Sequence, residues 1–200
     1  TIDQSFNVGT GANSIVNAIA VQTNGQILIG GQFFQYNGTP INYLARLNTD
    51  GSLDTTFNMG GSGPDFYVDA ITLQTNGQIL IGGSFSDYNG TGVGVFARPN
   101  TNSTLHTAFN TNLGTGFDST VQTIALETDG QIVVGGQFTN LNGSAANYLA
   151  RLNSNGTRDT VFSTNGGTGF NFPVFTLAIQ TDGRIVCGGN FRDFNGTARQ

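Results

Sequence analysis

The stretch Asn24-Gly25-Gln26-Ile27-Leu28-Ile29-Gly30-Gly31 decides the fold of this chain. It recurs with small changes at 76–83, 129–136 and 182–189. Repetition at a fixed period of about 50 residues indicates an array of similar structural units. Each copy opens with the Asn-Gly or Asp-Gly pair of a tight hairpin and continues as the short apolar run of a buried strand. The closing pair of glycines predicts the close approach of another backbone.

Each repeat is predicted to form four short strands, joined by tight turns and two longer loops. In the first repeat the strands are expected at 15–22, 26–33, 43–48 and 52–58, and no segment has a helical period. Repeats 1, 2 and 3 span 15–66, 67–119 and 120–172; residues 1–14 and an incomplete repeat 4 at 173–200 flank them. A β-trefoil has three repeats and a β-solenoid usually has shorter ones. The pattern therefore favours an all-β propeller with four-stranded blades of about 53 residues.

Several motifs lie in the same register in successive repeats. They are Asp-Gly-[Gln/Arg]-Ile-x-x-Gly-Gly, Phe-x-x-Tyr-Asn-Gly-Thr, Ala-Arg-Leu-Asn-x-x-Gly and Leu-Asp-x-x-Phe-Asn. Together they resemble the delta-60 repeat over essentially the whole chain. The resemblance implies a β-propeller from a large secreted or surface protein of bacteria. It implies no activity, because that family has no assigned catalytic residues.

Both ends of the chain fall inside repeats. Residues 2–7 match the fourth strand, because Asp3 and Phe6 align with Asp54 and Phe57. A stack of blades open at both ends would expose apolar faces, which soluble proteins avoid. We therefore expect a segment of a larger propeller with about seven or eight blades in all. The remaining blades would come from the same chain or from a second copy.

The composition argues against several classes of function. The chain of 200 residues has a net charge of −5 and contains no lysine. Such a surface argues against nucleic acid, whose binding depends on neutralising phosphates, and against anionic membrane surfaces. No apolar stretch approaches the ~20 residues of a membrane span, so no membrane insertion is expected.

Residues suited to catalysis or metal binding are few. Cys187 is the only cysteine and replaces an Ile or Val of the apolar run, which favours a small buried hydrophobe. His106 and Glu127 are each the only residue of their type. Hydrolase, zinc-protease and phosphate-loop motifs are absent. We expect a non-enzymatic chain with no cofactor and no metal.

Strand connectivity predicts which loops share a face. The loops between the second and third strands and those between repeats should lie together, with the Asx-Gly hairpins opposite; we call the first side the long-loop face. Binding residues tend to lie on such loops. The loops between repeats each carry one Asx residue: Asn13, Asp65, Asp118 and Asn171. These residues either form Asx turns or offer a ring of oxygens to sugar hydroxyls or Ca²⁺. One Asx per repeat supplies too few oxygens for Ca²⁺.

The other long loops carry an aromatic residue followed by Asn-Gly. The candidate ligand contacts there are Tyr36 with Asn37 and Tyr88 with Asn89. Aromatic rings beside amides are typical of glycan sites, but packed turns use them too, and Leu141 in repeat 3 favours packing. The asparagines also head Asn-x-Ser/Thr sequons, which a eukaryotic secreted protein would glycosylate. Turn chemistry alone explains Asn-Gly at these positions.

Arginines recur at the outer edge of each repeat. Arg46, Arg98 and Arg151 precede Asp54, His106 and Asp159 by eight residues. This spacing places each Arg across a hairpin from its partner, as an ion pair worth ~0–1 kcal/mol in repeats 1 and 3. Repeat 2 has His106 instead, so its outer edge is expected to be irregular.

The function expected from these observations is non-catalytic binding or adhesion outside the cell. The partner would be a glycan or a protein on a surface, contacted through the long-loop face. A bacterial surface protein and a viral or phage tail protein fit equally well. The alternatives are a structural spacer in a long repetitive chain, or a non-catalytic domain of a secreted enzyme.

Overall fold

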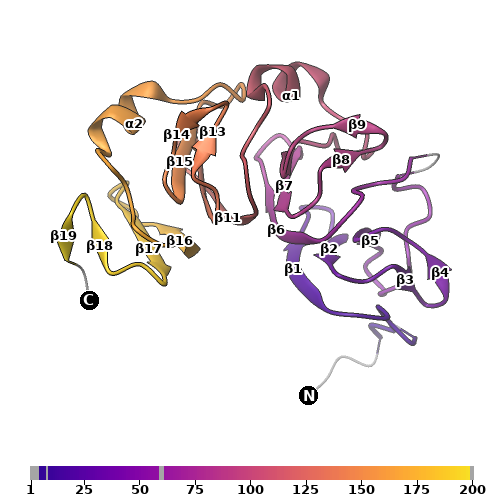
Figure 1. The fold of residues 1–200 in the computed structure, drawn as a ribbon. Helices are drawn as coiled ribbons and strands as arrows, with labels where there is room; N and C mark the ends of the chain where they lie inside the picture. The colour runs from indigo at the N-terminus through magenta and orange to yellow at the C-terminus, as the bar shows by residue number, and fades with distance from the viewer. Residues whose placement is uncertain (1–4, 8, 59–60, 199–200) are drawn as a thin grey trace.

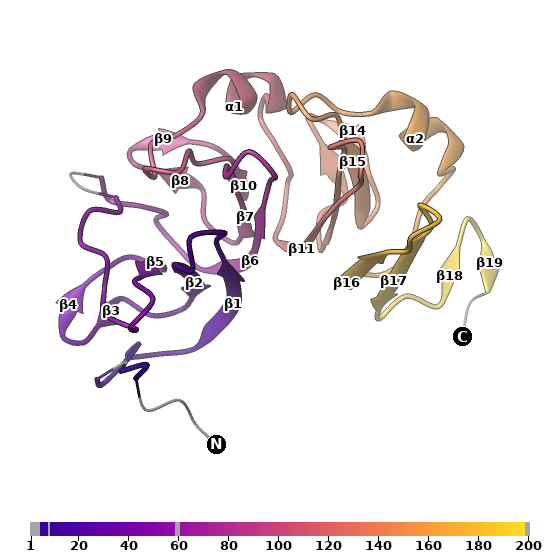
Figure 2. The same ribbon diagram turned by 180° about the vertical axis from the view of Figure 1, so that it is seen from behind.

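The computed structural model describes residues 5–7, 9–58 and 61–198. Within them, four antiparallel sheets stand side by side in an open arc (Figures 1 and 2). The first strand of each sheet lies on the inside of the arc. These inner strands are β1 (Val16–Val21), β6 (Val68–Leu73), β11 (Val121–Leu126) and β16 (Val174–Ile179). The fold is thus the predicted array of β-propeller repeats.

The apolar run of each repeat forms the second strand, after the Asx-Gly hairpin. These strands are β2 (Ile27–Gly31), β7 (Ile79–Gly83), β12 (Ile132–Gly136) and β17 (Ile185–Gly189). The first three are buried as predicted, with Leu80 and Val133 fully inaccessible. The prediction of a buried second strand is wrong for β17, where Val186 is 49% exposed; at the other end of the arc, Ile19 of β1 is 65% exposed. β1 and β17 belong to the first and last of the four sheets, so among the described residues each has a neighbouring repeat on one side only.

The third strand pairs with the second in the first three repeats. These strands are β5 (Leu44–Leu47), β10 (Phe96–Ala97) and β15 (Leu149–Leu152). β10 has two residues where its counterparts have four, so the prediction of an irregular outer edge in repeat 2 is confirmed. The fourth described sheet contains β16 and β17 alone.

The fourth strand predicted at 52–58 is wrong. A single bridge joins Leu47 to Leu53, and the chain then turns away. The Asp54 carboxylate causes the turn, because it accepts the Thr56 backbone N–H at 2.9 Å. In the next two repeats the corresponding residue caps a short helix, contrary to the expectation of no helix. These helices are α1 (Thr107–Leu113) and α2 (Thr160–Asn165).

A two-stranded hairpin forms in each loop between the second and third strands. The hairpins are β3 (Gln35–Tyr36) with β4 (Thr39–Pro40), β8 (Asp87–Tyr88) with β9 (Thr91–Gly92), β13 (Asn140–Leu141) with β14 (Ser144–Ala145), and β18 (Asp193–Phe194) with β19 (Thr197–Ala198). Each hairpin bridges to the loop entering its own repeat, for example Ala12 to Tyr36. The two kinds of long loop therefore share one face, as predicted. The Asn24 turn lies at the other end of β1, since Val21 pairs with Ile27 and Val16 with Gly31.

The paired glycines of the second strands explain how the sheets approach one another. A Cβ atom on Gly82 would lie 2.3 Å from Val121 Cγ1 of the next repeat. A Cβ atom on Gly83 would lie 2.1 Å from the Tyr67 carbonyl oxygen, opposite a bulge in β6. The first glycine thus admits a side chain of the neighbouring sheet, and the second admits the bulged backbone. The predicted close approach of backbone and sheet is confirmed.

The arginine pairs form at the outer edge and also cross between repeats. Arg46 Nε lies 2.8 Å from Asp54 Oδ2, and Arg46 Nη1 donates to the Thr101 carbonyl of repeat 2 at 2.7 Å. Arg151 pairs with Asp159 at 2.8 Å, as predicted, and additionally with Glu127 at 3.1 Å.

The strand predicted at 2–7 falls partly outside the described residues; Asn7 donates its backbone N–H to the Asp50 carbonyl. None of the described helices has the length and apolar character needed to span a membrane.

Candidate functional site on the long-loop face

The four predicted Asx residues hold the long loops together. Asn13 Oδ1 accepts backbone N–H groups of Phe34 at 2.9 Å and Gln35 at 3.0 Å. The same pair of bonds is formed by Asp65, Asp118 and Asn171. Burial would raise the pKa of the Asp118 carboxyl, but hydrogen bonds from Asn140 and Thr139 outweigh it and lower that pKa to about 2. These bonds reach 21 and 22 residues along the chain, so they are longer in range than the local Asx turns expected.

The asparagines at the tips of the hairpins form a second set of hydrogen bonds, to the loops that enter each repeat. Asn37 adopts a positive φ of 49°, and its Oδ1 accepts the backbone N–H of Gly11 at 2.9 Å. Asn89 Oδ1 accepts the backbone N–H of Gly63 at 2.6 Å. The same bond recurs in repeats 3 and 4, from Gly116 to Asn142 and from Gly169 to Asn195. Each long-loop pair is thus fastened by two reciprocal side-chain clamps.

Tyr36 and Tyr88 are core residues of these clamped loops. They are 2% and 0% exposed, and burial raises the pKa of both phenols. Their hydroxyls donate to the carbonyls of Gly51 at 2.7 Å and Ser103 at 2.8 Å. The structure therefore gives all eight predicted ligand contacts a framework role, and it leaves neither tyrosine ring face accessible. Ligand contact through the polar atoms of these residues stays a prediction.

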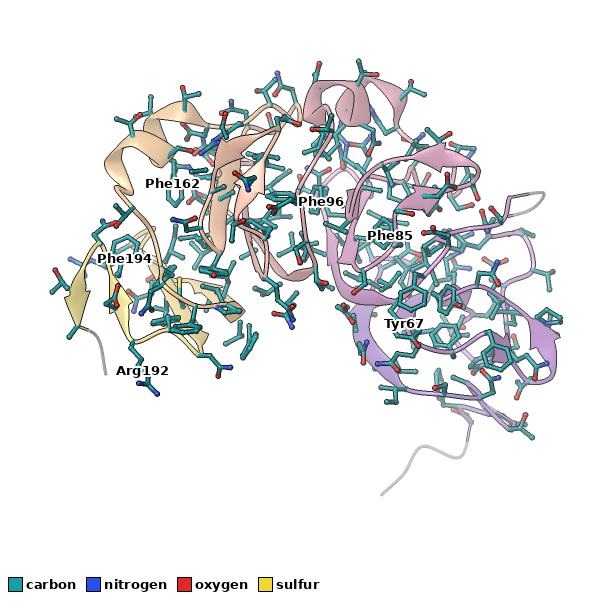
Figure 3. All side chains as sticks on the ribbon, in the orientation of Figure 1. Tyr67, Phe85, Phe96, Phe162, Arg192 and Phe194 are labelled. Atoms are coloured by element: carbon teal, nitrogen blue, oxygen red, sulfur yellow. The ribbon has the colours of Figure 1, made fainter. Side chains whose placement is uncertain are left out.

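An aromatic cluster that the sequence analysis missed lies on the same face, between repeats 1 and 2. It consists of Tyr43, Phe66 and Tyr67, and Tyr67 is labelled in Figure 3. Phe66 stacks on Tyr67 with ring centroids 3.9 Å apart, and Tyr43 meets Tyr67 edge-on at 5.6 Å. Phe66 is 43% exposed. The signal available in the sequence was a local excess of rings, since the junction of repeats 2 and 3 has Ser119 and Thr120 where the junction of repeats 1 and 2 has Phe66 and Tyr67.

A row of polar side chains begins beside this cluster, at the bulges of the inner strands. Asn17 of β1 donates to Asp69 of β6 across the gap between repeats, with Nδ2 2.7 Å from Oδ1. Burial raises the pKa of the Asp69 carboxyl, against hydrogen bonds from Asn17 and Ser84. The Oε1 atom of Gln122, at the corresponding bulge of β11, is buried without a hydrogen-bond partner. Amide and carboxyl oxygens thus stand at the bulges of successive inner strands.

Cys187, His106 and the acidic residues are the side chains suited to metal binding or nucleophilic chemistry. Within the described ranges no three His, Cys, Asp or Glu residues are close enough to hold a metal ion. Burial raises the pKa of the Cys187 thiol to about 11, so it stays protonated at neutral pH. His106 is occupied at the outer edge, where its Nδ1 accepts the Phe109 backbone N–H at 3.2 Å.

The fold and this face define a β-propeller of a repeat class, and the family comparison agrees. A family model described as a domain of unknown function, the DUF5122 beta-propeller, matches residues 22–57, 74–109 and 127–162. These segments cover more than half of the chain, one in each complete repeat. The chain therefore belongs to the DUF5122 β-propeller family. The match supports a β-propeller repeat family, and the finer resemblance to the delta-60 repeat stays a prediction. No curated protein matches the chain.

Several solved structures resemble parts of the chain. One is a protein of unknown function from Bacteroides caccae, with TM-score 0.47, 15% identity, and coverage of 79% of this chain and 52% of that one. Another is the extracellular domain of a hybrid two component system from B. thetaiotaomicron, with TM-score 0.48, 12% identity, and coverage of 86% and 20%. A second such extracellular domain from B. thetaiotaomicron has TM-score 0.41 and 14% identity, and the match covers 88% of this chain and 26% of that one. The chain spans about half or less of the length of these structures.

Proposed function

We propose that this chain is a non-enzymatic binding module that contacts a carbohydrate through the aromatic cluster of Tyr43, Phe66 and Tyr67. The observation that carries the proposal is a cluster of three rings in mutual contact, of which Phe66 is 43% exposed. Exposed aromatic clusters on soluble proteins usually mark contact sites. A sugar ring presents an apolar C–H face to an aromatic ring and hydroxyls at its edge. Asp69, Asn17 and Asp65 lie along the adjoining loops and strands as hydrogen-bonding groups.

The clamped loops support this function by keeping the face rigid. A loop ordered before binding loses less conformational entropy when a ligand arrives. Both kinds of clamp recur in all four repeats, so the rings stand on a fixed framework. The surrounding charge is acidic, which suits a neutral or amino sugar better than a sulfated one. A location outside the cell, or on the surface of a cell or virion, with a role in adhesion, is part of the proposal; the motif resemblance supports a secreted or surface protein of bacteria.

The test is a glycan array probed with the whole chain. Phe66→Ser and Tyr67→Thr introduce the residues that stand at the same positions of the next junction, Ser119 and Thr120, so the fold is expected to persist. We expect each variant to weaken binding at least about tenfold, the size of one well-placed aromatic contact. Phe34→Ser is the matched control, because Phe34 is 55% exposed and belongs to none of the observed ring pairs. Binding that survives both cluster variants, or is lost in the control as well, would contradict the proposal.

A structural spacer is the second candidate function, and the repetition of the clamps favours it. Identical fastening in every repeat is what a rigid rod or ring requires, whether or not a ligand binds. A chain that binds no glycan on the array and no protein on the host surface, while its loop amides are strongly protected from hydrogen exchange, would favour this alternative.

A further inference from the structure

A cavity of about 460 Å³ opens on the outer part of repeat 3. It lies between the β13–β14 hairpin, α2 and the loop that leads to repeat 4. Its wall includes Ala146, Leu149, Phe162, Phe194 and one charged residue, Arg158. Phe162 belongs to α2 and Phe194 to β18, at the repeat 4 end of the arc (Figure 3). A largely apolar cavity of this volume with a few polar groups is typical of small-molecule sites.

Repeat 2 fills the corresponding space with its own side chains. Three residues that are 0–4% exposed there are replaced in repeat 3 by smaller ones. The pairs are Val93 with Ala146, Phe96 with Leu149, and Leu113 with Gly166. The cavity therefore arises from missing side-chain volume on an unchanged framework. The side chain of Leu113 in repeat 2 shows what kind of group the space accepts, namely a branched aliphatic or ring-sized apolar body.

Arg158 places a positive charge in this wall, at a position where repeats 1 and 2 have Leu53 and Leu105. Its guanidinium is held by neutral acceptors. Nε donates to Ser163 Oγ at 2.8 Å, Nη1 donates to the Ser144 carbonyl at 3.1 Å, and Nη2 donates to the Ala145 carbonyl. No ion pair of Arg158 occurs within the described part of the chain.

The charge of Arg158 is left without compensation by these contacts. A guanidinium has five N–H donors, of which these bonds use three. One N–H on each terminal nitrogen remains, and an arginine N–H forms a strong charge-assisted hydrogen bond to a carboxylate. Burial also lowers the pKa of Arg158, which indicates that the cation has lost solvent without gaining a counter-charge.

We propose that this cavity binds a small ligand that combines an apolar body with a carboxylate. The body occupies the space that Leu113 and its neighbours fill in repeat 2, and the carboxylate pairs with Arg158. The site is separate from the aromatic cluster between repeats 1 and 2, so it does not depend on the function proposed above. Repeat 1 has a groove of about 410 Å³ at the corresponding place, with Leu53 in its wall, and it offers no cation.

The experiment titrates the whole chain with phenylacetate and, as a neutral match, benzyl alcohol, followed by amide chemical shifts. We expect phenylacetate to shift signals around Ala146, Phe162 and Gly166 and to bind at least about tenfold more tightly than benzyl alcohol. Arg158→Leu installs the residue of repeats 1 and 2 and should remove that preference while benzyl alcohol still binds. Ala146→Val installs the residue of repeat 2 and should weaken both ligands.

Three results would overturn the proposal. They are the absence of phenylacetate binding at tens of millimolar, a preference for phenylacetate that survives Arg158→Leu, and shifts centred elsewhere, such as on Tyr67. The fold of each variant is checked by its amide spectrum. If Arg158→Leu does not fold, Ala146→Val decides, because a phenylacetate affinity unchanged by the added methyl groups contradicts binding in this cavity.

Discussion

Repeats 2 and 3 share a backbone plan but stabilise their outer edges differently. In repeat 3, Arg151 is neutralised by Asp159 and Glu127, and its guanidinium lies 4.7 Å above the ring of Phe162. In repeat 2, Arg98 is 7% exposed and faces His106 at 3.3–3.4 Å, an imidazole that supplies no negative charge. The Nε atom of Arg98 is buried without a hydrogen-bond partner. Repeat 3 thus neutralises its half-buried arginine with carboxylates, whereas repeat 2 leaves its buried arginine without a carboxylate.

Repeat 2 compensates with other contacts. Arg98 Nη1 donates to the Ser154 carbonyl of repeat 3 at 2.8 Å, and its guanidinium lies only 4.0 Å from the ring of Phe109. Below that ring the core is filled by Phe96 and Leu113, both essentially inaccessible. The same backbone therefore supports two arrangements of the outer edge. Repeat 2 has dense apolar packing beside an arginine without a carboxylate partner, and repeat 3 has an ion-paired arginine and a cavity.

The largest effect is expected from emptying the core of repeat 2. Leu113→Ala removes a side chain that is 1% exposed and packs with Phe96 and Phe109. The loss of buried apolar volume and the resulting cavity should lower the free energy of unfolding by about 2–5 kcal/mol. Urea unfolding of the whole chain measures it. A loss below 1 kcal/mol would mean that repeat 2 relaxes into the looser packing of repeat 3 and that its dense core is not what stabilises it.

The carboxylates of repeats 1 and 3 should make stability depend on acid pH. Burial would raise the pKa of Asp54, but hydrogen bonds from Thr56 and the contact with Arg46 lower it to about 2, below its ordinary value. Its contribution is therefore present above pH ~4 and is lost as the pH falls toward ~2, by about 1–2 kcal/mol. Asp54→Asn should be less stable at pH 7 and should show a shallower loss between pH 4 and 2. An acid profile parallel to that of the unaltered chain would refute this assignment.

A smaller gain is expected from giving repeat 2 the carboxylate that its neighbours have. His106→Asp places an acid beside Arg98 in the geometry of Asp159, which also caps α2 by accepting the backbone N–H groups of Val161 and Phe162. The new residue can therefore keep the cap of α1 while neutralising a buried cation. We expect a gain of about 1 kcal/mol in urea unfolding at pH 7, disappearing near pH 2. The reverse change, Asp159→His, should destabilise repeat 3, and equal stability of both variants would argue against charge compensation.

The sequence predicted the repeats, the inner strands and the shared face of the long loops, because these depend on local turn chemistry and short apolar runs. It failed at the fourth strand because the alternation of Leu53 and Phe57 resembles a strand. There the Asp54 carboxylate accepts the backbone N–H of Thr56, and a turn forms in place of further strand pairing after the bridge at Leu53.

The candidate site was harder to predict, for a different physical reason. Tyr43 lies 24 positions before Tyr67, and the two meet only because neighbouring sheets press together. Tyr36 and Tyr88 precede Asn-Gly turns, a position that fits both a glycan contact and a packed turn. The structure shows packing, because both rings are buried and their hydroxyls donate to carbonyls 15 residues away. Which aromatic residues are accessible is set by packing between repeats, which a pattern within one repeat does not contain.

The smallest effect concerns the turn that closes the outer edge of repeat 2. Ser103 has a φ of 67°, where Gly51 and Gly156 in the neighbouring repeats have 87° and 95°. A left-handed conformation costs an ordinary side chain roughly 1–2 kcal/mol. Ser103→Gly removes this strain but loses a long hydrogen bond to Asn58 (3.3 Å) and adds about 0.4–1 kcal/mol of unfolded-state entropy. We therefore expect a net gain of about 0.5 kcal/mol, or about 1–2 °C in melting temperature.

The matched control, Gly51→Ser, should destabilise the chain, because its Cβ would also lie 3.0 Å from the Asn7 carbonyl oxygen. A loss of stability in Ser103→Gly would show that the bond to Asn58 outweighs the strain and that repeat 2 has adapted to its serine.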